Sequence, residues 1–134
     1  MPTTKLCADW LEATLVAGLG VSVAKGAAAW DRPALGASNG YIEWRSDTPA
    51  YDQRTGHALD SGACLFDVVI VSTNEVALWS LIDLARTTAR AYTRATIDNQ
   101  TMRIRFGAWE RLERTDETPD ALRYAAVATV TMQY

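Results

Sequence analysis

The sequence predicts a small α+β protein: a single domain spanning residues 1–134, with two helices and a mostly antiparallel or mixed sheet of about four main strands, in the order α-β-β-α-β-β. Three observations predict this class. An apolar run at residues 64–71 leads directly into an amphipathic helix, and alternating segments flank that unit on both sides. The length suits one domain with one core.

The apolar run at residues 64–71 is the expected centre of the sheet. Its side chains are apolar on both alternating faces, apart from Asp67, as in a strand that is covered on both sides. Ser72 to Glu75 then match a capping box at the start of a helix. The inner stripe of that helix is expected to contain Leu78, Leu81, Ile82, Ala85, Ala89 and Tyr92. The opposite, solvent-facing side contains Asp83, Arg86, Thr87, Arg90 and Arg94.

A first helix is expected at residues 5–19, with Thr3 or Thr4 as its cap. Gly18 and Gly20 are expected to end it, because glycine accepts the left-handed conformation at a helix C-terminus. Its buried stripe is expected to contain Leu6, Trp10, Ala13 and Ala17, with Cys7 and Leu11 beside them. Residues 21–24 allow a short strand.

The segment between the first helix and the apolar run contains one expected strand and two expected loops. Residues 26–40 are rich in Ala and Gly and predict a loop pinned by Trp30. Residues 41–46 alternate, with Ile42 and Trp44 on one face and Glu43 and Arg45 on the other, and predict a half-buried strand. Residues 47–62 are polar and predict a long loop that projects from one end of the sheet.

Two further strands are expected after the second helix. Residues 102–106 alternate, with Arg103 and Arg105 facing out, and residues 107–108 interrupt the pattern as a bulge or bend would. Residues 109–114 resume as strand, and residues 115–120 form an acidic turn. The final strand is expected at residues 122–134, with Leu122, Tyr124, Ala126, Val130 and Met132 on one face and Arg123, Thr129, Thr131 and Gln133 on the other.

Composition excludes several classes of function. The net charge of -3 argues against a dedicated nucleic-acid binder. No apolar run approaches the roughly 18 residues of a membrane helix, and the N-terminus lacks the pattern of a signal peptide. We therefore expect a cytosolic chain without membrane contact.

No catalytic, metal-binding or cofactor-binding residues are expected. The single histidine, His57, lies in a polar segment and is interpreted as a solvated side chain. Cys7 and Cys64 have no CxxC spacing and are interpreted as small buried apolar residues. The glycine-containing segments lack the lysine and helix that a phosphate loop requires.

Asp67 is the one unusual residue in the apolar run. Burial would raise the pKa of such a carboxyl and suit it to acid catalysis. The favoured interpretation is a pair with an arginine or a hydroxyl on a neighbouring strand, or a position at an assembly interface.

The candidate interaction residues are charged or aromatic. The arginines of the second helix and the following strand allow three interpretations: a phosphate-binding face, a solvated face with Asp83 as partner, or pairing with the acidic turn of a neighbouring subunit. Five tryptophans exceed what one small core needs, and Trp79 lies at the margin of its helix stripe, which favours an oligomer. The interface or lumen candidates are Trp79, Arg86, Arg90, Arg94, Arg103, Arg105, Asp116, Glu117, Asp120, Asp52 and Arg54.

The order of these elements resembles the tail terminator (tail completion) family of long-tailed bacteriophages. The likeness rests on the opening helix with Leu6, Trp10 and Leu11, on the strand–helix unit at residues 65–92, and on the closing strand at residues 124–134. It covers most of the chain as a likeness of length, order and pattern. The site candidates come from charge and exposure, and not from the resemblance.

The resemblance implies a structural virion subunit that is not an enzyme and needs no cofactor. Such subunits form a homohexameric ring in the tail or neck, after assembly in the host cytoplasm. The ring caps the tail tube, ends its polymerisation and joins the head–tail connector or stopper protein, while genomic DNA passes through the lumen without specific binding. Another neck protein, such as a head–tail stopper or connector-completion protein, is the nearest alternative. A small cytosolic ligand-binding or enzymatic domain, with a pocket near residues 47–62 that holds Asp67 or His57, is the alternative from another class.

Overall fold

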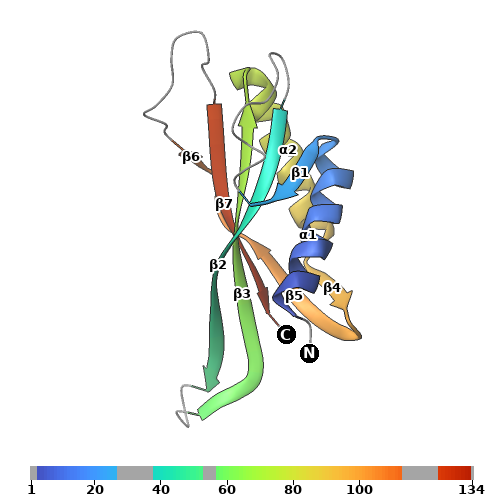
Figure 1. Cartoon of the computed structure of the whole chain (residues 1–134), viewed down its shortest axis with the longest axis vertical. Coiled ribbons are helices and arrows are strands. Elements are labelled where there is room, and N and C mark those ends of the chain that lie inside the picture. Colours follow the sequence, from blue (N-terminus) through green and yellow to red (C-terminus); the bar gives the residue numbers. More distant parts are fainter. Residues whose placement is uncertain (1–2, 27–37, 53–56, 113–123, 134) are drawn as a thin grey trace.

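The computed structural model has two helices and one mixed, strongly twisted sheet of seven strands (Figure 1). It describes residues 3–26, 38–52, 57–112 and 124–133, and for residues 46–52 and 57–62 the backbone alone. The elements are α1 (Thr4–Leu19), β1 (Ser22–Lys25), β2 (Ser38–Asp52), β3 (His57–Ser72), α2 (Glu75–Ala91), β4 (Arg94–Ile97), β5 (Gln100–Phe106), β6 (Glu110–Leu112) and β7 (Tyr124–Gln133). The mixed α+β class is confirmed. The expectation of about four strands in the order α-β-β-α-β-β is wrong.

The strands follow the order β1-β2-β3-β7-β5-β4, and β6 pairs with β7. β1 and β2 are parallel, and every other pair is antiparallel. β3 occupies one edge of β7 along its length, whereas β5 and β6 share the other edge. The expected central strand therefore lies at the centre of the sheet.

The part of β3 from Phe66 to Val71 is covered on both faces, as its apolar run predicts. Phe66, Val68 and Ile70 belong to the large core between the sheet and the two helices. Val69 and Val71 belong to a smaller cluster on the other face, which β6 helps to cover through Leu112. In Figure 1 both helices lie on the same side of the sheet.

α1 matches its expected bounds, but its buried stripe is different. Thr3 caps it, and its side chain accepts a hydrogen bond from the amide of Leu6. Gly20 ends it in the left-handed conformation, with φ 69°. The buried residues are Cys7, Leu11, Leu15 and Leu19, whereas the expected Leu6, Ala13 and Ala17 are exposed. The helix carries apolar side chains on several faces, so the sequence pattern alone does not single out the face that meets the sheet.

Gly18 does not end α1, contrary to expectation. It lies where α1 crosses α2, and a Cβ at this position would lie 2.2 Å from Oγ1 of Thr88. Thr88 is buried, and its hydroxyl donates to the carbonyl of Leu84. The absence of a side chain at residue 18 lets the two helices approach each other.

α2 begins two residues later than the capping box predicts, because that pattern expects Ser72 as the N-cap. Asn74 is the N-cap, and its side chain accepts hydrogen bonds from the amides of Val76 and Ala77. Ser72 still belongs to β3, and its hydroxyl accepts a hydrogen bond from the amide of Asn74. The buried residues of α2 are Leu78, Leu81, Ala85 and Thr88, while the expected Tyr92 is exposed. The exposed polar side, with Asp83, Arg86, Thr87 and Arg90, is confirmed.

The expected long loop at residues 47–62 is instead a β-hairpin arm. β2 and β3 continue to pair as far as Asp52 and His57. We define the arm as residues 47–52 of β2 and 57–62 of β3, because the pairing of β3 with β7 ends at Ala63. Figure 1 shows the arm reaching beyond the helices at one end of the molecule, so the projection was predicted and its structure was not.

The connection after α2 contains a hairpin that the sequence interpretation missed. β4 pairs with β5 across Asp98 and Asn99, whose φ values are 51° and 60°. Two consecutive residues at positive φ are typical of a tight hairpin turn. Met102 and Ile104 face the core while Arg103 and Arg105 are exposed, as predicted. The expected bend follows β5, where the amide of Gly107 donates to the carbonyl of Thr129.

An ion-pair cluster ties α1 to β1. Asp9 contacts both Lys5 and Lys25, and Glu12 lies 3.6 Å from the ammonium of Lys25. The hydrogen bonds from Lys25 and Lys5 lower the pKa of Asp9 below its ordinary value. The hydrogen bond to Asp9 raises the pKa of Lys25 above its ordinary value.

Gly18→Ala should lower the free energy of unfolding by about 1–3 kcal/mol, because the new methyl overlaps Thr88 at the helix crossing. In a Thr88→Ala background the same change should have a much smaller effect, since the hydroxyl and methyl that collide are gone. Urea unfolding of the original chain, the two single variants and the double variant measures the coupling between the two substitutions. Equal effects of Gly18→Ala in both backgrounds would contradict the crossing.

Lys25→Met should lower stability in a pH-dependent way. The lowered pKa of Asp9 contributes stability above its ordinary value of 3.8, and that contribution is lost as the pH falls through the folded-state pKa. The raised pKa of Lys25 contributes stability below 10.5, and that contribution is lost as the pH rises through the folded-state pKa. Urea unfolding measures the difference in the free energy of unfolding between the original chain and the variant. This difference should be constant between about pH 5 and 9 and should shrink on either side. A difference unchanged at pH 3 would refute the assignment.

Candidate functional site

Asp67 is held by partners on both neighbouring strands, which confirms the favoured interpretation of this residue. The guanidinium of Arg45 on β2 lies 3.5 Å from the Asp67 carboxylate and donates to Oγ1 of Thr129 at 2.9 Å. Thr129 on β7 in turn donates to Asp67 at 3.2 Å. The three side chains form a closed set of contacts on the sheet face away from the helices. We therefore interpret Asp67 as a link between strands.

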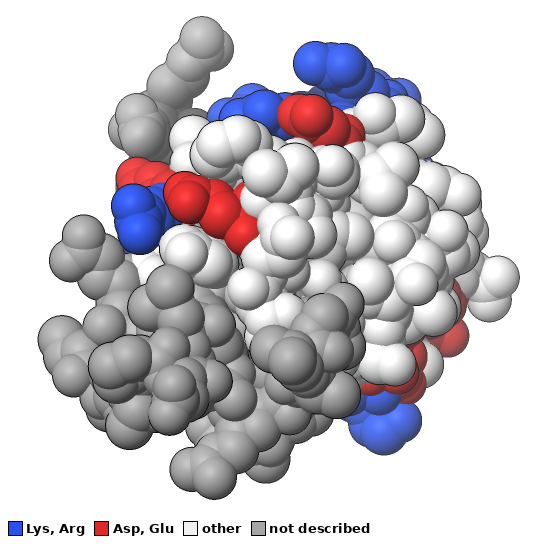
Figure 2. Space-filling model, turned by 90° about the horizontal axis from the view of Figure 1, so that it is seen from above, with Lys and Arg blue, Asp and Glu red and all other residues white. Residues whose placement is uncertain are grey.

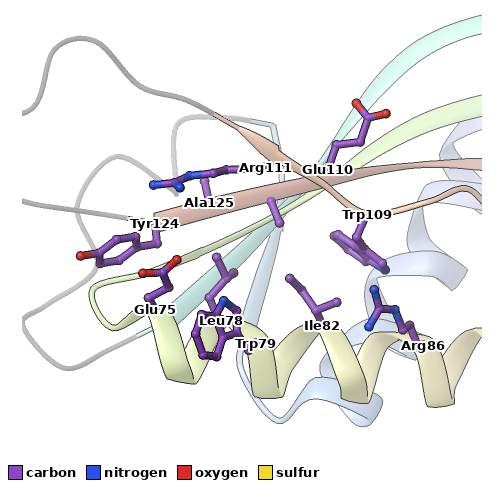
Figure 3. Close-up of a pocket in the computed structure, with 11 residues that line it drawn as sticks. Glu75, Leu78, Trp79, Ile82, Arg86, Trp109, Glu110, Arg111, Tyr124 and Ala125 are labelled. Atoms are coloured by element: carbon purple, nitrogen blue, oxygen red, sulfur yellow. The ribbon is translucent and has the colours of Figure 1, made fainter.

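A small hollow lies between the N-terminal half of α2 and the β6–β7 pair, with a volume of about 130 Å³ (Figure 3). Trp79 and Ile82 line it from α2, opposite Trp109, and Figure 3 shows Glu75 and Tyr124 together at one end. This volume is close to that of a cavity that holds one benzene-sized group. Trp79 is 56% exposed, so its expected place at the margin of the helix stripe is confirmed.

Four of the predicted arginines converge on a shallow groove of about 690 Å³. This arginine groove is lined by Arg90, Arg94, Arg103 and Arg105, together with Ala89, Thr93, Ile104 and Phe106. Arg94 and Arg103 are direct partners in the antiparallel register of β4 and β5, so two positive charges stand opposite each other. All four arginines are exposed.

Arg86 belongs to a different environment. Its guanidinium lies 3.3 Å from the carboxylate of Asp83, three residues earlier on α2, as the solvated-face interpretation predicts. It also borders the hollow beside Trp79. The structure therefore separates Arg86 from the arginine groove.

Trp44 shares the helix-facing side of β2 with Ile42, as predicted, because it is the register partner of the core residue Phe66. Its side chain is 58% exposed, whereas Ile42 is buried. β1 pairs with β2 only as far as Ile42, and the β2–β3 register shifts between Trp44 and Ser46. The edge of β2 is therefore no longer paired with β1 beside Trp44, and the side chain of Trp44 is left exposed.

Cys7 is buried, as expected, whereas Cys64 is only partly buried. The remaining candidates lie outside the described residues: Trp30, Arg54, Asp116, Glu117 and Asp120. For Asp52 and His57 the backbone is placed at the end of the arm, and their side chains lie outside the description.

The described residues contain no group of three or more His, Cys, Asp or Glu side chains arranged to hold a metal ion. Within the same ranges, no helix is long and apolar enough to cross a membrane. Figure 2 shows the end of the molecule opposite the arm, where a broad area without charged side chains is bordered by charges of both signs. The described residues of this end therefore present no field of a single sign, such as a phosphate-binding surface has.

The sequence predicts only some of the residues that line the hollow and the arginine groove. Trp109 and Tyr124, which line the hollow, were missed as site residues. The only signal in the sequence is the break at residues 107–108, which places Trp109 at a bend. Convergence of Arg90 with Arg105 depends on the packing of α2 beside β5, which no local pattern records.

No protein family model matches the sequence, and no curated protein matches it at a significant level of similarity. The surfaces described above therefore carry the functional argument.

Asp67→Asn should lower the free energy of unfolding by no more than about 1 kcal/mol, because its ion pair with Arg45 is partly exposed. Arg45→Met should have a similar effect. The double variant should lose less free energy of unfolding than the two single variants lose together. Urea unfolding measures all three chains. A loss several times larger for Asp67→Asn alone would contradict the interpretation of a partly solvated strand link.

Proposed function

We propose that this protein is a structural subunit of the tail or neck of a long-tailed phage, of the tail terminator kind. Copies form a ring, six-fold by the resemblance, that caps the tail tube, ends its polymerisation and meets the head connector. The ring carries out no catalysis and needs no cofactor, and DNA passes through its lumen. The observation that carries the proposal is the free-standing β2–β3 arm.

The arm lacks support from its own chain in the described part of the structure. β1 leaves the edge of β2 after Ile42, and β7 leaves the edge of β3 at Ala63. The arm thus continues as a two-stranded ribbon with both outer edges unpaired by any described residue. An isolated two-stranded hairpin is marginally stable in water, and unpaired strand edges bind other chains. A neighbouring subunit or the tail tube would supply the missing contacts.

Exposed tryptophans support an assembly function. Trp79 and Trp44 are each more than half exposed, although large aromatic side chains favour burial. Tryptophan is enriched among the residues that dominate binding energy at protein interfaces, where it inserts into pockets or forms their walls. The hollow beside Trp79 has room for one large side chain of a partner.

The mild net negative charge of -3 suits a ring through which DNA moves. Each Lys or Arg contact with phosphate adds affinity, so a lumen rich in free cations would retain DNA. A head–tail stopper or connector-completion protein would share all of these features. Binding to tail tubes, as opposed to the head connector, separates a terminator from these alternatives.

Removal of the arm tests the proposal. Residues 49–62 are replaced by Asn-Gly, which joins Thr48 to its register partner Ala63 by a tight turn. The deletion leaves in place every described residue of the core between the sheet and the helices, so the variant should keep its far-UV circular dichroism and a thermal midpoint within a few degrees of the original. Light scattering and electron microscopy, alone and with tail tubes of the same phage, should show rings for the original chain and monomers for the variant.

Two outcomes oppose the proposal. An original chain that stays monomeric alone and also fails to join tail tubes would exclude a ring subunit, and would favour a ligand-binding or enzymatic domain. An arm-less variant that assembles as well as the original would remove the observation on which the proposal rests. Val16→Ala, which changes an exposed apolar side chain of α1 without touching the arm, is the matched control for fold and solubility.

A further inference from the structure

We propose that the arginine groove binds the acidic segment at residues 115–120 of a second copy of this chain. The inference rests on the proposed ring and names one contact between its subunits. The groove comprises Arg90, Arg94, Arg103 and Arg105, and the acidic segment supplies Asp116, Glu117 and Asp120.

The arginine groove lacks counter-charge within the described residues. Lys5, Lys25, Arg45 and Arg86 all form ion pairs with carboxylates of the described chain. None of the ion pairs in the same ranges involves an arginine of the groove. Arg94 and Arg103 face each other directly across β4 and β5, an arrangement of like charges that destabilises a strand pair. A carboxylate brought between them would relieve this repulsion.

The shape of the groove suits an extended segment. β4 covers the outer edge of β5 only as far as Arg103, and the amide of Ile104 then donates to the carbonyl of Thr93. The remaining edge, at Arg105 and Phe106, lies beside the end of α2 with a partly apolar floor. Arginine forks bind carboxylates through paired hydrogen bonds, so several arginines along one edge favour an acidic peptide over a single small anion.

The acidic segment is rooted far from the arginine groove of its own chain. It joins Leu112 to Tyr124, beside the β6–β7 pair, where Leu112 is the register partner of Ala125. Arg105 is the partner of Thr131 and Arg103 that of Gln133, six and eight residues further along β7, or about 20 and 26 Å at the rise of a strand. Glu117 lies five residues from Leu112, and its backbone reaches at most about 18 Å when fully extended. Figure 1 shows β6 and the β4–β5 hairpin at opposite ends of the molecule.

Pairing within one chain would therefore need a fully stretched segment folded back along the sheet. Pairing between two chains needs no such stretch. A contact between two different patches of one subunit is heterologous, and such contacts close into rings when the rotation between subunits permits. The positions of the two charged regions thus favour a head-to-tail arrangement of copies.

Charge reversal in two separate chains tests the contact. The groove variant carries Arg103→Glu and Arg105→Glu, and the segment variant carries Asp116→Lys and Glu117→Lys. Each variant alone places like charges at every contact and should stay monomeric at low salt. An equimolar mixture should assemble, because alternating subunits restore opposite charges at both kinds of contact. Light scattering measures the oligomeric state of all three samples, and Ala13→Glu, at an exposed position of α1, is the control for a change in net charge outside the groove.

A peptide of residues 113–123 tests the groove without requiring a ring. Its labelled form should bind the full chain at low salt, and this binding should weaken as ionic strength rises. It should bind the groove variant at least about tenfold less tightly, a loss of about 1.4 kcal/mol.

If the original chain forms rings while the groove variant assembles equally well and the peptide does not bind, the inference fails and the proposed function stands. An acidic segment lining the lumen is then the remaining interpretation. If a short DNA duplex binds the groove and the peptide does not, the groove is a phosphate site and the inference is overturned. If the peptide binds while the original chain never assembles, the proposed function fails separately.

Discussion

The rest of the structure depends on one buried strand pair, β3 with β7. Apolar side chains of β3 fill the core under the helices on one face and a second cluster on the other, so this pair cannot shift register without exposing both. The second edge of β7 then serves two strands in turn, β5 and β6. The chain must bend sharply between them, and Gly107 permits this, because a Cβ there would lie 3.2 Å from the carbonyl oxygen of Thr129.

The sequence predicts those elements whose side chains meet the core. The two-sided apolar run of β3, the amphipathic α2 and the alternation of β5 all follow from contact with a buried layer. The arm was missed because its polar sequence shows no alternation of the kind that burial imposes. β4 was missed because it is four residues long and its turn, Asp98-Asn99, lacks the glycine that usually marks such hairpins. The start of α2 was misplaced because Ser72 and Asn74 both offer a capping side chain, and the extent of β3 decides between them.

For the candidate site too, the sequence predicts the local contacts and misses those that depend on the tertiary fold. A carboxylate in the middle of an apolar strand needs a partner, and its nearest candidates are the side chains of the adjacent strands, so the pairing of Asp67 followed from local reasoning. The exposure of Trp44 did not follow, because it depends on where β1 ends beside β2. The arginine groove joins the end of α2 to β4 and β5, and only the tertiary fold brings these segments together.

Electrostatics alone would not hold such a ring together. A net charge of -3 on every copy is repulsive between subunits, and exposed charge pairs contribute little free energy in salt. The favourable free energy of association must come mainly from buried apolar area, to which exposed aromatic side chains such as Trp79 can contribute. The strand edges of the arm can add backbone hydrogen bonds. Paired charges then select the register and orientation in which those surfaces meet. In the proposed ring the acidic segment would neutralise the groove arginines of its neighbour, so these cations would not hold the phosphates of passing DNA.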